Sequence, residues 1–148
     1  MRTIPPIACL LLSLSTGVAV AQESGGGLPR TASPEGAEVY IQSPEDGAEL
    51  TSPFTVRFGL RGMGVAPAGI TAENTGHHHL LIDVETLPPS NLPLPASDNV
   101  RHYGLGQTET ELELPPGEHT LQLVLGDALH IPHDPPVRSE KITITVVE

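Results

Sequence analysis

Hydrophobic and polar residues alternate along much of the chain after residue 37, which is the pattern of β-strands with one buried face. The clearest run is 109–114, where a glutamate occupies every second position. The same period of two occurs at 38–42, 54–60, 78–84, 119–125 and 141–147. Turn-forming Pro and Gly separate these runs, as at Pro115-Pro116-Gly117. The pattern predicts six or seven short strands.

No segment carries a helical stripe of apolar residues free of Gly and Pro. Many short strands joined by Pro- and Gly-containing turns are typical of two packed sheets. We therefore predict an all-β fold, an immunoglobulin-like antiparallel β-sandwich of about seven strands.

The N-terminal residues differ in composition from the rest of the chain. A positive start at Arg2, an apolar stretch over 7–20 and the small residues Ala19 and Ala21 predict a cleaved signal peptide over 1–21. An uncleaved anchor is the alternative. Residues 22–36 lack apolar periodicity and predict a flexible linker, which leaves 37–148 as one sandwich domain. The expected location is periplasmic or secreted, with no membrane insertion after processing.

The amino-acid composition excludes several kinds of site and partner. Cys9 is the single cysteine and lies in the predicted signal peptide, so the mature chain has neither a disulfide nor a thiolate ligand. Eighteen acidic residues against seven basic ones give a formal charge of −11. Such a surface repels phosphate backbones, so we expect no nucleic-acid partner. An acidic surface concentrates cations, and the sequence identifies no protein partner.

All seven histidines fall between His77 and His133. If the strands follow immunoglobulin order, three connections emerge at the same end of the sandwich. These connections are 61–76, which ends at the histidine triplet, 97–107, which contains His102, and 126–138, which contains His130. Six histidines would then gather at one apex, with His119 at the opposite end.

Strand parity refines this prediction. His78 shares parity with Leu80, Ile82 and Val84 and should face the core, whereas His77 and His79 share the other face. Two imidazoles spaced in this way stand about 7 Å apart at Cα and suit the chelation of one ion. The predicted metal ligands are His77, His79, His102, His130 and His133, for copper or zinc. Met63 in the same apex is a further candidate ligand for Cu(I), although a loop methionine is more often apolar filler.

Two properties follow for such a nitrogen site. Cu(II) should bind more tightly than Zn(II), as the Irving–Williams order requires. Binding should weaken below pH about 6.5, where free imidazole takes up a proton.

Other interpretations remain open. Buried histidines often hydrogen-bond backbone carbonyls and brace loops, which would make this a structural or protein-interaction domain. The apex could also take an organic or peptide ligand. A metal-dependent hydrolase is the third reading, but the chain has no His-Glu-x-x-His helix and no Gly-x-Ser-x-Gly elbow. We therefore expect a binding module and not an enzyme.

Several motifs resemble one known family. They are Gly76-His77-His78-His79-Leu80-Leu81-Ile82-Asp83, Gly106-Gln107-Thr108-Glu109, Pro116-Gly117-Glu118-His119-Thr120-Leu121-Gln122-Leu123 and His130-Ile131-Pro132-His133-Asp134-Pro135-Pro136 with Ser139. Together they are similar to exported bacterial domains grouped as domain of unknown function 4399, over about Tyr40 to Val146. The resemblance implies an exported domain and brings no established activity. The pattern from Ser43 to Pro53 is also similar to many bacterial immunoglobulin-like modules.

Overall fold

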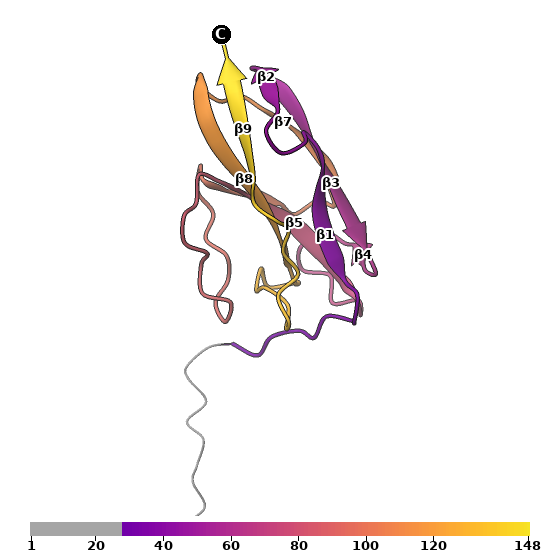
Figure 1. Cartoon of the computed structure of the whole chain (residues 1–148). Coiled ribbons are helices and arrows are strands. Elements are labelled where there is room, and N and C mark those ends of the chain that lie inside the picture. The colour runs from indigo at the N-terminus through magenta and orange to yellow at the C-terminus, as the bar shows by residue number, and fades with distance from the viewer. Residues whose placement is uncertain (1–27) are drawn as a thin grey trace, which may run out of the picture.

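The computed structural model describes residues 28–148 of the chain (Figure 1). The predicted signal peptide, 1–21, and the first part of the predicted linker lie outside the described residues. Every regular element within 28–148 is a β-strand. In this part of the chain, no helix is long and apolar enough to cross a membrane.

Nine strands form two sheets. The smaller sheet has the order β1-β3-β7, from β1 (Glu38–Ser43), β3 (Phe54–Arg61) and β7 (Glu109–Leu112). The larger sheet has the order β2-β9-β8-β5-β4, from β2 (Glu49–Thr51), β9 (Ile142–Val147), β8 (Gly117–Gly126), β5 (Thr75–Ile82) and β4 (Gly64–Val65). A sixth strand of this sheet, β6 (Val100–Tyr103), also pairs with β5.

The apolar residues of the two sheets meet in one core. Val56 from β3, Leu123 from β8 and Ile144 from β9 are all fully buried in it. These residues occupy alternate positions on their strands, as the sequence pattern predicted, because successive side chains of a strand point to opposite faces. Burying such aliphatic side chains stabilises the fold by about 1.5–3 kcal/mol each.

The strand order confirms an immunoglobulin-like sandwich. When the short strands β2 and β4 are set aside, the first, second and fifth strands (β1, β3 and β7) form one sheet. The other four (β5, β6, β8 and β9) form the second sheet. The number of strands exceeds the expected seven because β2 and β4 are additional short strands. These two pair in parallel with β9 and β5, whereas all the other pairings are antiparallel.

One connection differs from the prediction. We expected residues 97–107 to form a loop, but 100–103 form β6, which pairs with β5 and places His102 opposite His79. Val84 also departs from the predicted core face. The strand ends before it, Asp83 has a positive φ of 55°, and Val84 packs on a second apolar cluster.

That second cluster lies on the outer face of the larger sheet. Leu81 of β5, Val100 of β6 and Val124 of β8 pack there against Leu94 from the connection between β5 and β6. Leu81 shares parity with His77 and His79, so the connection shields the same sheet face that carries these histidines.

The predicted linker is bonded to the domain over its C-terminal part. Arg30 donates hydrogen bonds to the carbonyl oxygens of Pro132 and His133 and forms an ion pair of 3.0 Å with Asp134. Ala32 forms a β-bridge with Asp134. Residues 30–34 are therefore part of the folded unit. Main-chain and side-chain hydrogen bonds fix them, and such bonds leave no apolar periodicity in the sequence.

Candidate metal site

Strand β5 presents its histidines on two faces. His78 points into the core, where its ring lies 5.1 Å from that of Phe58, centroid to centroid. His77 and His79 point to the outer face, with ring centroids 4.8 Å apart. The parity prediction is thus confirmed, and two imidazoles stand side by side because one residue separates them on a strand.

Two neighbouring segments bring further imidazoles to this pair. His102 lies on β6 directly opposite His79, and His130 reaches over from the connection between β8 and β9. We call the four residues His77, His79, His102 and His130 the histidine cage. Its six centroid distances are 4.8 Å for 77–79, 4.9 Å for both 77–102 and 77–130, 5.2 Å for 79–102, 5.9 Å for 79–130 and 4.7 Å for 102–130.

Two glycines make room for these rings. A Cβ on Gly126 would stand 2.7 Å from Cε1 of His79 and 3.3 Å from Cα of His130. A Cβ on Gly104 would overlap the ring of His102. These distances are shorter than ordinary carbon contacts, so a side chain at either position would require the neighbouring rings to shift.

Asp127 shapes the loop that carries His130. Its Oδ1 accepts hydrogen bonds from the main-chain nitrogens of Leu129 and Ile131, and its Oδ2 accepts one from Thr31 Oγ1. Two of these donors belong to the loop backbone, and the third is a side chain of the N-terminal segment. Asp127 therefore serves as a scaffold for the cage.

His130 holds an unusual backbone conformation within that loop. Its φ is +68°, a region that costs a non-glycine residue roughly 1–3 kcal/mol. Its N–H donates to the carbonyl of Asp127, and its own carbonyl accepts from the N–H of Leu94. These two bonds hold the main chain in place and aim the ring at the other three histidines.

The cage contains buried nitrogens without hydrogen-bond partners. His77 and His79 are each 1% exposed. Neither nitrogen of His79 has a partner, nor has Nε2 of His77. A buried polar atom without a partner costs about 1–3 kcal/mol. These nitrogens are therefore available to bind a metal ion or a proton.

A proton is the less favourable occupant. Burial and, to a smaller extent, the neighbouring His77, His102 and His130 lower the pKa of His79 to about 3. Burial likewise lowers the pKa of His77 to about 4, helped by His130 and His102 and opposed by Asp127. The pKa of His102 is also lowered, by burial and by His130. These three imidazoles are consequently neutral at pH 7, the form in which imidazole binds metal.

The donor set fits a transition-metal ion. One nitrogen from each of His77, His79 and His102 lies within 4.8 Å of the others. Imidazole nitrogens bind zinc or copper at about 2.0 Å, so a modest closure of these rings would bring all three into the coordination sphere. His77 and His79 are buried and His102 is exposed, which leaves the site accessible from the side of β6.

The other histidines lie outside the cage. His133 is fully buried, with Nδ1 3.4 Å from the carbonyl oxygen of Leu125 and Nε2 3.2 Å from that of Thr75. It thus lies at the predicted end of the sandwich, but its nitrogens face main-chain oxygens. Met63 packs on the main core, which is the ordinary role of a loop methionine.

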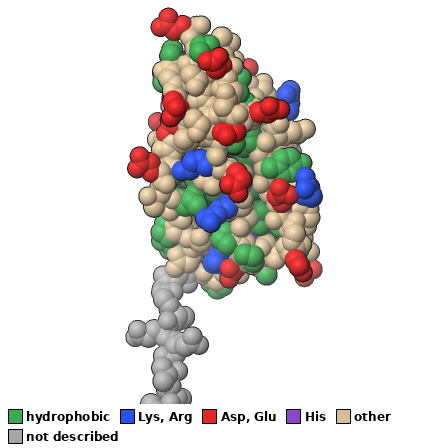
Figure 2. Space-filling view, in the orientation of Figure 1, with side chains coloured by type: hydrophobic (Ala, Val, Ile, Leu, Met, Phe, Trp, Pro, Cys, Tyr) green, Lys and Arg blue, Asp and Glu red, His purple; other side chains and the backbone are tan. Residues whose placement is uncertain are grey.

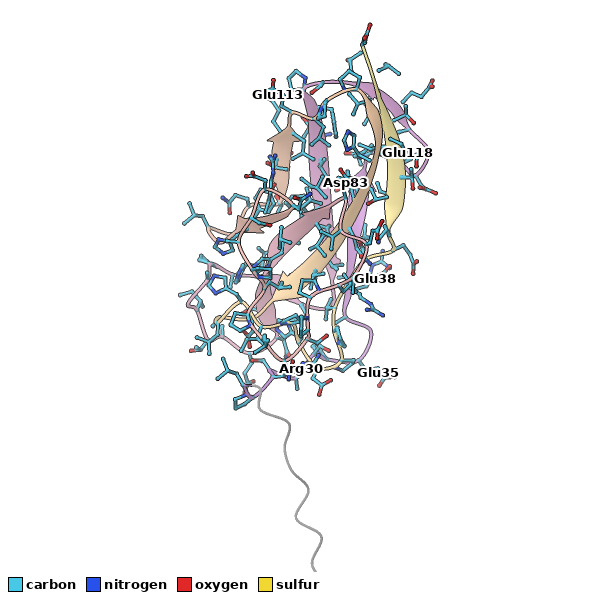
Figure 3. All side chains as sticks on the ribbon, turned by 90° about the vertical axis from the view of Figure 1, so that its left-hand side faces the viewer. Arg30, Glu35, Glu38, Asp83, Glu113 and Glu118 are labelled. Atoms are coloured by element: carbon cyan, nitrogen blue, oxygen red, sulfur yellow. The ribbon has the colours of Figure 1, made fainter. Side chains whose placement is uncertain are left out.

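His119 stands at the opposite end, as expected. Its Nδ1 lies 2.8 Å from Oδ2 of Asp83 and its Nε2 lies 2.9 Å from the carbonyl oxygen of Pro115. Figure 3 shows Glu113 and Glu118, which flank this turn, at the end of the molecule remote from Arg30. His119 therefore braces the turn between β7 and β8.

Sequence reasoning missed the glycines and the scaffold role of Asp127. Gly126 follows a strand and precedes a Pro-rich loop, so its position resembled that of any turn glycine. Nothing in the sequence distinguishes Gly104 from its neighbour Gly106. Asp127 was one of many acidic residues, and its bonds to the main chain depend on the folded loop.

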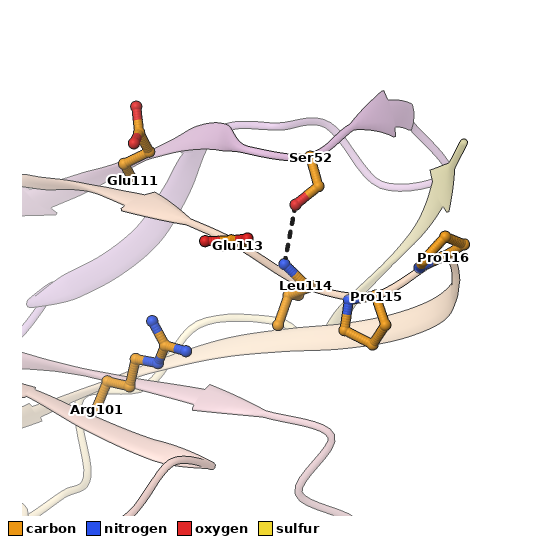
Figure 4. Close-up of a pocket in the computed structure, with 7 residues that line it drawn as sticks. All are labelled: Ser52, Arg101, Glu111, Glu113, Leu114, Pro115 and Pro116. Carbon is orange, nitrogen blue, oxygen red and sulfur yellow. Dashed lines mark hydrogen bonds between the residues drawn. The ribbon is translucent and has the colours of Figure 1, made fainter.

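Among the described residues, a groove with no histidine in its lining lies beside the turn between β7 and β8. It has a volume of about 850 Å³ and is lined by Ser52, Arg101, Glu111, Glu113, Leu114, Pro115 and Pro116 (Figure 4). Within it, Ser52 Oγ accepts a hydrogen bond of 3.1 Å from the N–H of Leu114. Its glutamates are exposed, as expected of a solvated strand edge.

A family model for domain of unknown function 4399 (DUF4399) matches residues 56–147. The chain belongs to this family. The matched range runs from within β3 to the end of β9 and includes every residue of the histidine cage. Membership confirms the resemblance found in the sequence motifs. No curated protein matches the sequence.

Two solved structures are similar in outline. One is the endo-beta-1,4-mannanase from Thermotoga petrophila, at 19% identity and a TM-score of 0.45, covering 76% of this chain and 20% of that chain. This chain therefore spans about a fifth of the mannanase chain. The other contains fibronectin(III)-like modules of CbhA from Clostridium thermocellum, at 14% identity and a TM-score of 0.35, covering 73% of this chain and 94% of that chain.

Proposed function

We propose that this protein is an exported binding module that holds a transition-metal ion, copper or zinc, in the histidine cage. His77, His79 and His102 supply three of the nitrogens, and the neighbouring ring of His130 supplies the fourth. The protein acts as a carrier or sensor of the ion and not as an enzyme. Its location is the periplasm or the extracellular medium.

One observation carries the proposal: three nitrogens of His77 and His79 are buried without a partner. Histidines that merely brace loops direct their nitrogens at carbonyl oxygens, as His133 does. Packing four imidazoles together, with three buried nitrogens unbonded, costs stability that a bound ion would recover.

The surface is compatible with cation capture. Figure 2 shows Asp and Glu side chains spread over the visible face, with only a few Lys and Arg between them. A negative surface raises the local concentration of cations and speeds their arrival. The field supports binding but does not select the ion, because selectivity resides in the ligands.

Metal binding is tested with purified mature protein that carries no histidine tag. Elemental analysis after exposure to Cu(II) and Zn(II), together with calorimetric titration at pH 7.5, should give one saturable site. His79→Ala should abolish or greatly weaken this site, whereas His119→Ala should leave it intact. The absence of saturable binding, or equal losses in both variants, would contradict the proposal.

A second candidate function is a structural or protein-interaction domain. The contacts of His133 and His119 favour it. His133 bridges the carbonyl oxygens of Leu125 and Thr75, and His119 bridges the carboxylate of Asp83 and the carbonyl oxygen of Pro115. Under this reading the cage histidines would also be structural, and their replacement would lower stability in the absence of metal. The titration above and the stability measurement described below separate the two.

A further inference from the structure

The shape of the histidine cage restricts the ions that it can accept. If the four ring centroids lay at the corners of a square, two of the six distances would be about 1.4 times as long as the other four, the pattern expected of a square-planar site. The observed distances run from 4.7 to 5.9 Å, and five of them lie between 4.7 and 5.2 Å. Five nearly equal separations and one longer one describe a distorted tetrahedron.

The size of this tetrahedron also fits a metal ion. Its centre lies about 3 Å from each ring centroid, which is the distance expected when an ion sits about 2 Å from a ring nitrogen that faces it. Nitrogens of His77, His79 and His102 already converge to within 4.8 Å of one another, and a rotation of the His130 ring would be needed to bring a fourth nitrogen to the remaining corner. The fold fixes the shape from three directions. His77 and His79 come from β5, His102 from β6, and His130 from a loop whose main chain is bonded on both sides.

Charge supplies a second restriction. All four cage residues are imidazoles, and the carboxylate closest in the loop, Asp127, already accepts three hydrogen bonds from Thr31, Leu129 and Ile131. No anionic ligand therefore offsets the charge of a bound ion. The cost of burying an ion rises steeply with its charge, so a monovalent ion enters this half-enclosed site at lower cost than a divalent one.

We propose that the cage is a tetrahedral site for closed-shell d¹⁰ ions, and that it holds copper as Cu(I) in preference to Cu(II). This inference rests on the proposed metal-binding function and specifies its substrate. Cu(I) and Zn(II) impose no geometry through their d electrons, whereas Cu(II) favours tetragonal or square-planar coordination. The expectation that Cu(II) outcompetes Zn(II), drawn from the Irving–Williams order, applies to a site free to adapt its shape. A cage fixed by two strands and a bonded loop opposes that adaptation.

The test compares ions on the same untagged mature protein. Cu(I) affinity is measured without oxygen by competition with a chromophoric Cu(I) chelator, and Cu(II) affinity by competition with an amino-acid chelator. Cu(I) should bind at least tenfold more tightly than Cu(II), which corresponds to a rise of 59 mV or more in the potential of the bound copper relative to the free couple. Co(II) should give the intense visible absorption of a tetrahedral complex.

His130→Ala removes one corner of the tetrahedron. It should weaken Cu(I) binding at least tenfold but weaken Cu(II) binding less, because a divalent ion readily takes a water ligand at the vacated position, as zinc does in three-histidine sites. His119→Ala is the matched control and should leave the ratio of affinities unchanged. Saturable binding with Cu(II) tighter than Cu(I), or with the weak Co(II) absorption of six coordination, would overturn this inference and leave metal binding in place. The absence of binding by any ion would overturn both proposals.

Discussion

Individual residues of the histidine cage are placed for binding at the expense of stability. His79 illustrates this, because it is buried, has two nitrogens without partners, and has a pKa lowered to about 3. An apolar residue of similar breadth would pack in the same space without any polar atom to satisfy. Functional sites commonly carry such a cost to the fold.

We predict that His79→Val makes the metal-free protein more stable. Removal of two unsatisfied buried nitrogens should raise the free energy of unfolding by about 1 kcal/mol, the lower end of the penalty for such groups. Chemical denaturation in the presence of a chelator measures this change, and titration of the same variant should show metal binding lost. A decrease in stability of 1 kcal/mol or more would instead show that His79 has a structural role, as in the second candidate function.

A second prediction concerns the space that glycine leaves. Gly126→Ala should weaken metal binding about tenfold or more, because the new Cβ displaces the ring of His79 and crowds the main chain of His130 without removing any nitrogen. Gly64→Ala is the matched control, since its Cβ would meet only Thr75 Cγ2, at 3.4 Å. Equal affinities for the two variants would show that the cage does not depend on this close packing.

At the scale of elements, the segment 28–36 is hydrogen-bonded to the domain and does more than link it to the preceding residues. It runs beneath the connection between β8 and β9 (Figure 1) and joins it through Arg30, Thr31 and Ser33. Thr31 bonds Asp127, which in turn shapes the loop of His130. The start of the folded chain and the cage are thus connected through two side chains.

We predict that Arg30→Ala lowers stability by about 1.5–3 kcal/mol, the range for charged hydrogen bonds that are partly buried. Arg57→Ala is a suitable control, because its exposed ion pair with Glu109 should contribute about 0–1 kcal/mol. Thermal or urea denaturation of the two variants gives the comparison. A change below 0.5 kcal/mol for Arg30→Ala would restore the view of a passive linker.

The sequence was sufficient for the elements whose faces differ in polarity. Alternation located β3, β7, β8 and β9, and parity oriented the three consecutive histidines of β5 correctly. It failed for β6, where Arg101 and His102 obscure the alternation, and this error placed His102 in a loop. It also failed for Arg30 and Asp127, whose partners are main-chain oxygens and nitrogens distant along the chain. Periodicity reports buried apolar faces, and it contains no information on such bonds.

At the scale of the whole molecule, the histidines at the two ends respond oppositely to pH. Burial tends to lower the pKa of His119, but its bonds to Asp83 and Pro115 outweigh this and hold the pKa above its ordinary value. Its contribution to stability is therefore complete at low pH and is lost as pH rises through that pKa. The pKa values of His77 and His79 lie well below 6.5, so their contribution is complete above that value and is lost on acidification.

We predict that the metal-free protein loses stability as pH falls from about 6.5 toward 4. In this range the histidines of the unfolded chain take up protons, whereas the buried histidines of the cage stay neutral. Urea denaturation in chelator at pH 7.5, 6 and 5 should show this decline. In His119→Ala the decline between pH 6 and 5 should be unchanged, because the contribution of His119 is already complete below about pH 6.5; only the change between pH 7.5 and 6 should differ. A flat profile in both proteins would show that the cage histidines take up protons as freely as those of an unfolded chain.

Metal binding should persist to lower pH than free imidazole would allow. The pKa values of about 4 and 3 for His77 and His79 leave these nitrogens unprotonated through the mildly acidic range. We predict that the affinity for Zn(II) at pH 5.5 stays within about tenfold of that at pH 7.5, since few protons must be displaced. A fall of a hundredfold or more between pH 7.5 and 6 would indicate ligands with ordinary pKa values.

The described chain begins beside the connection that carries His130 and ends at the opposite pole of the sandwich (Figure 1). This polarity matters for anyone who handles the protein. A purification tag of histidines joined before Leu28 would place competing imidazoles next to the site and imitate the binding that it was meant to help measure. A tag or fluorophore joined after Glu148 would stand a full strand length away. Immobilisation or labelling at the C-terminus therefore leaves the binding and release of the metal ion undisturbed.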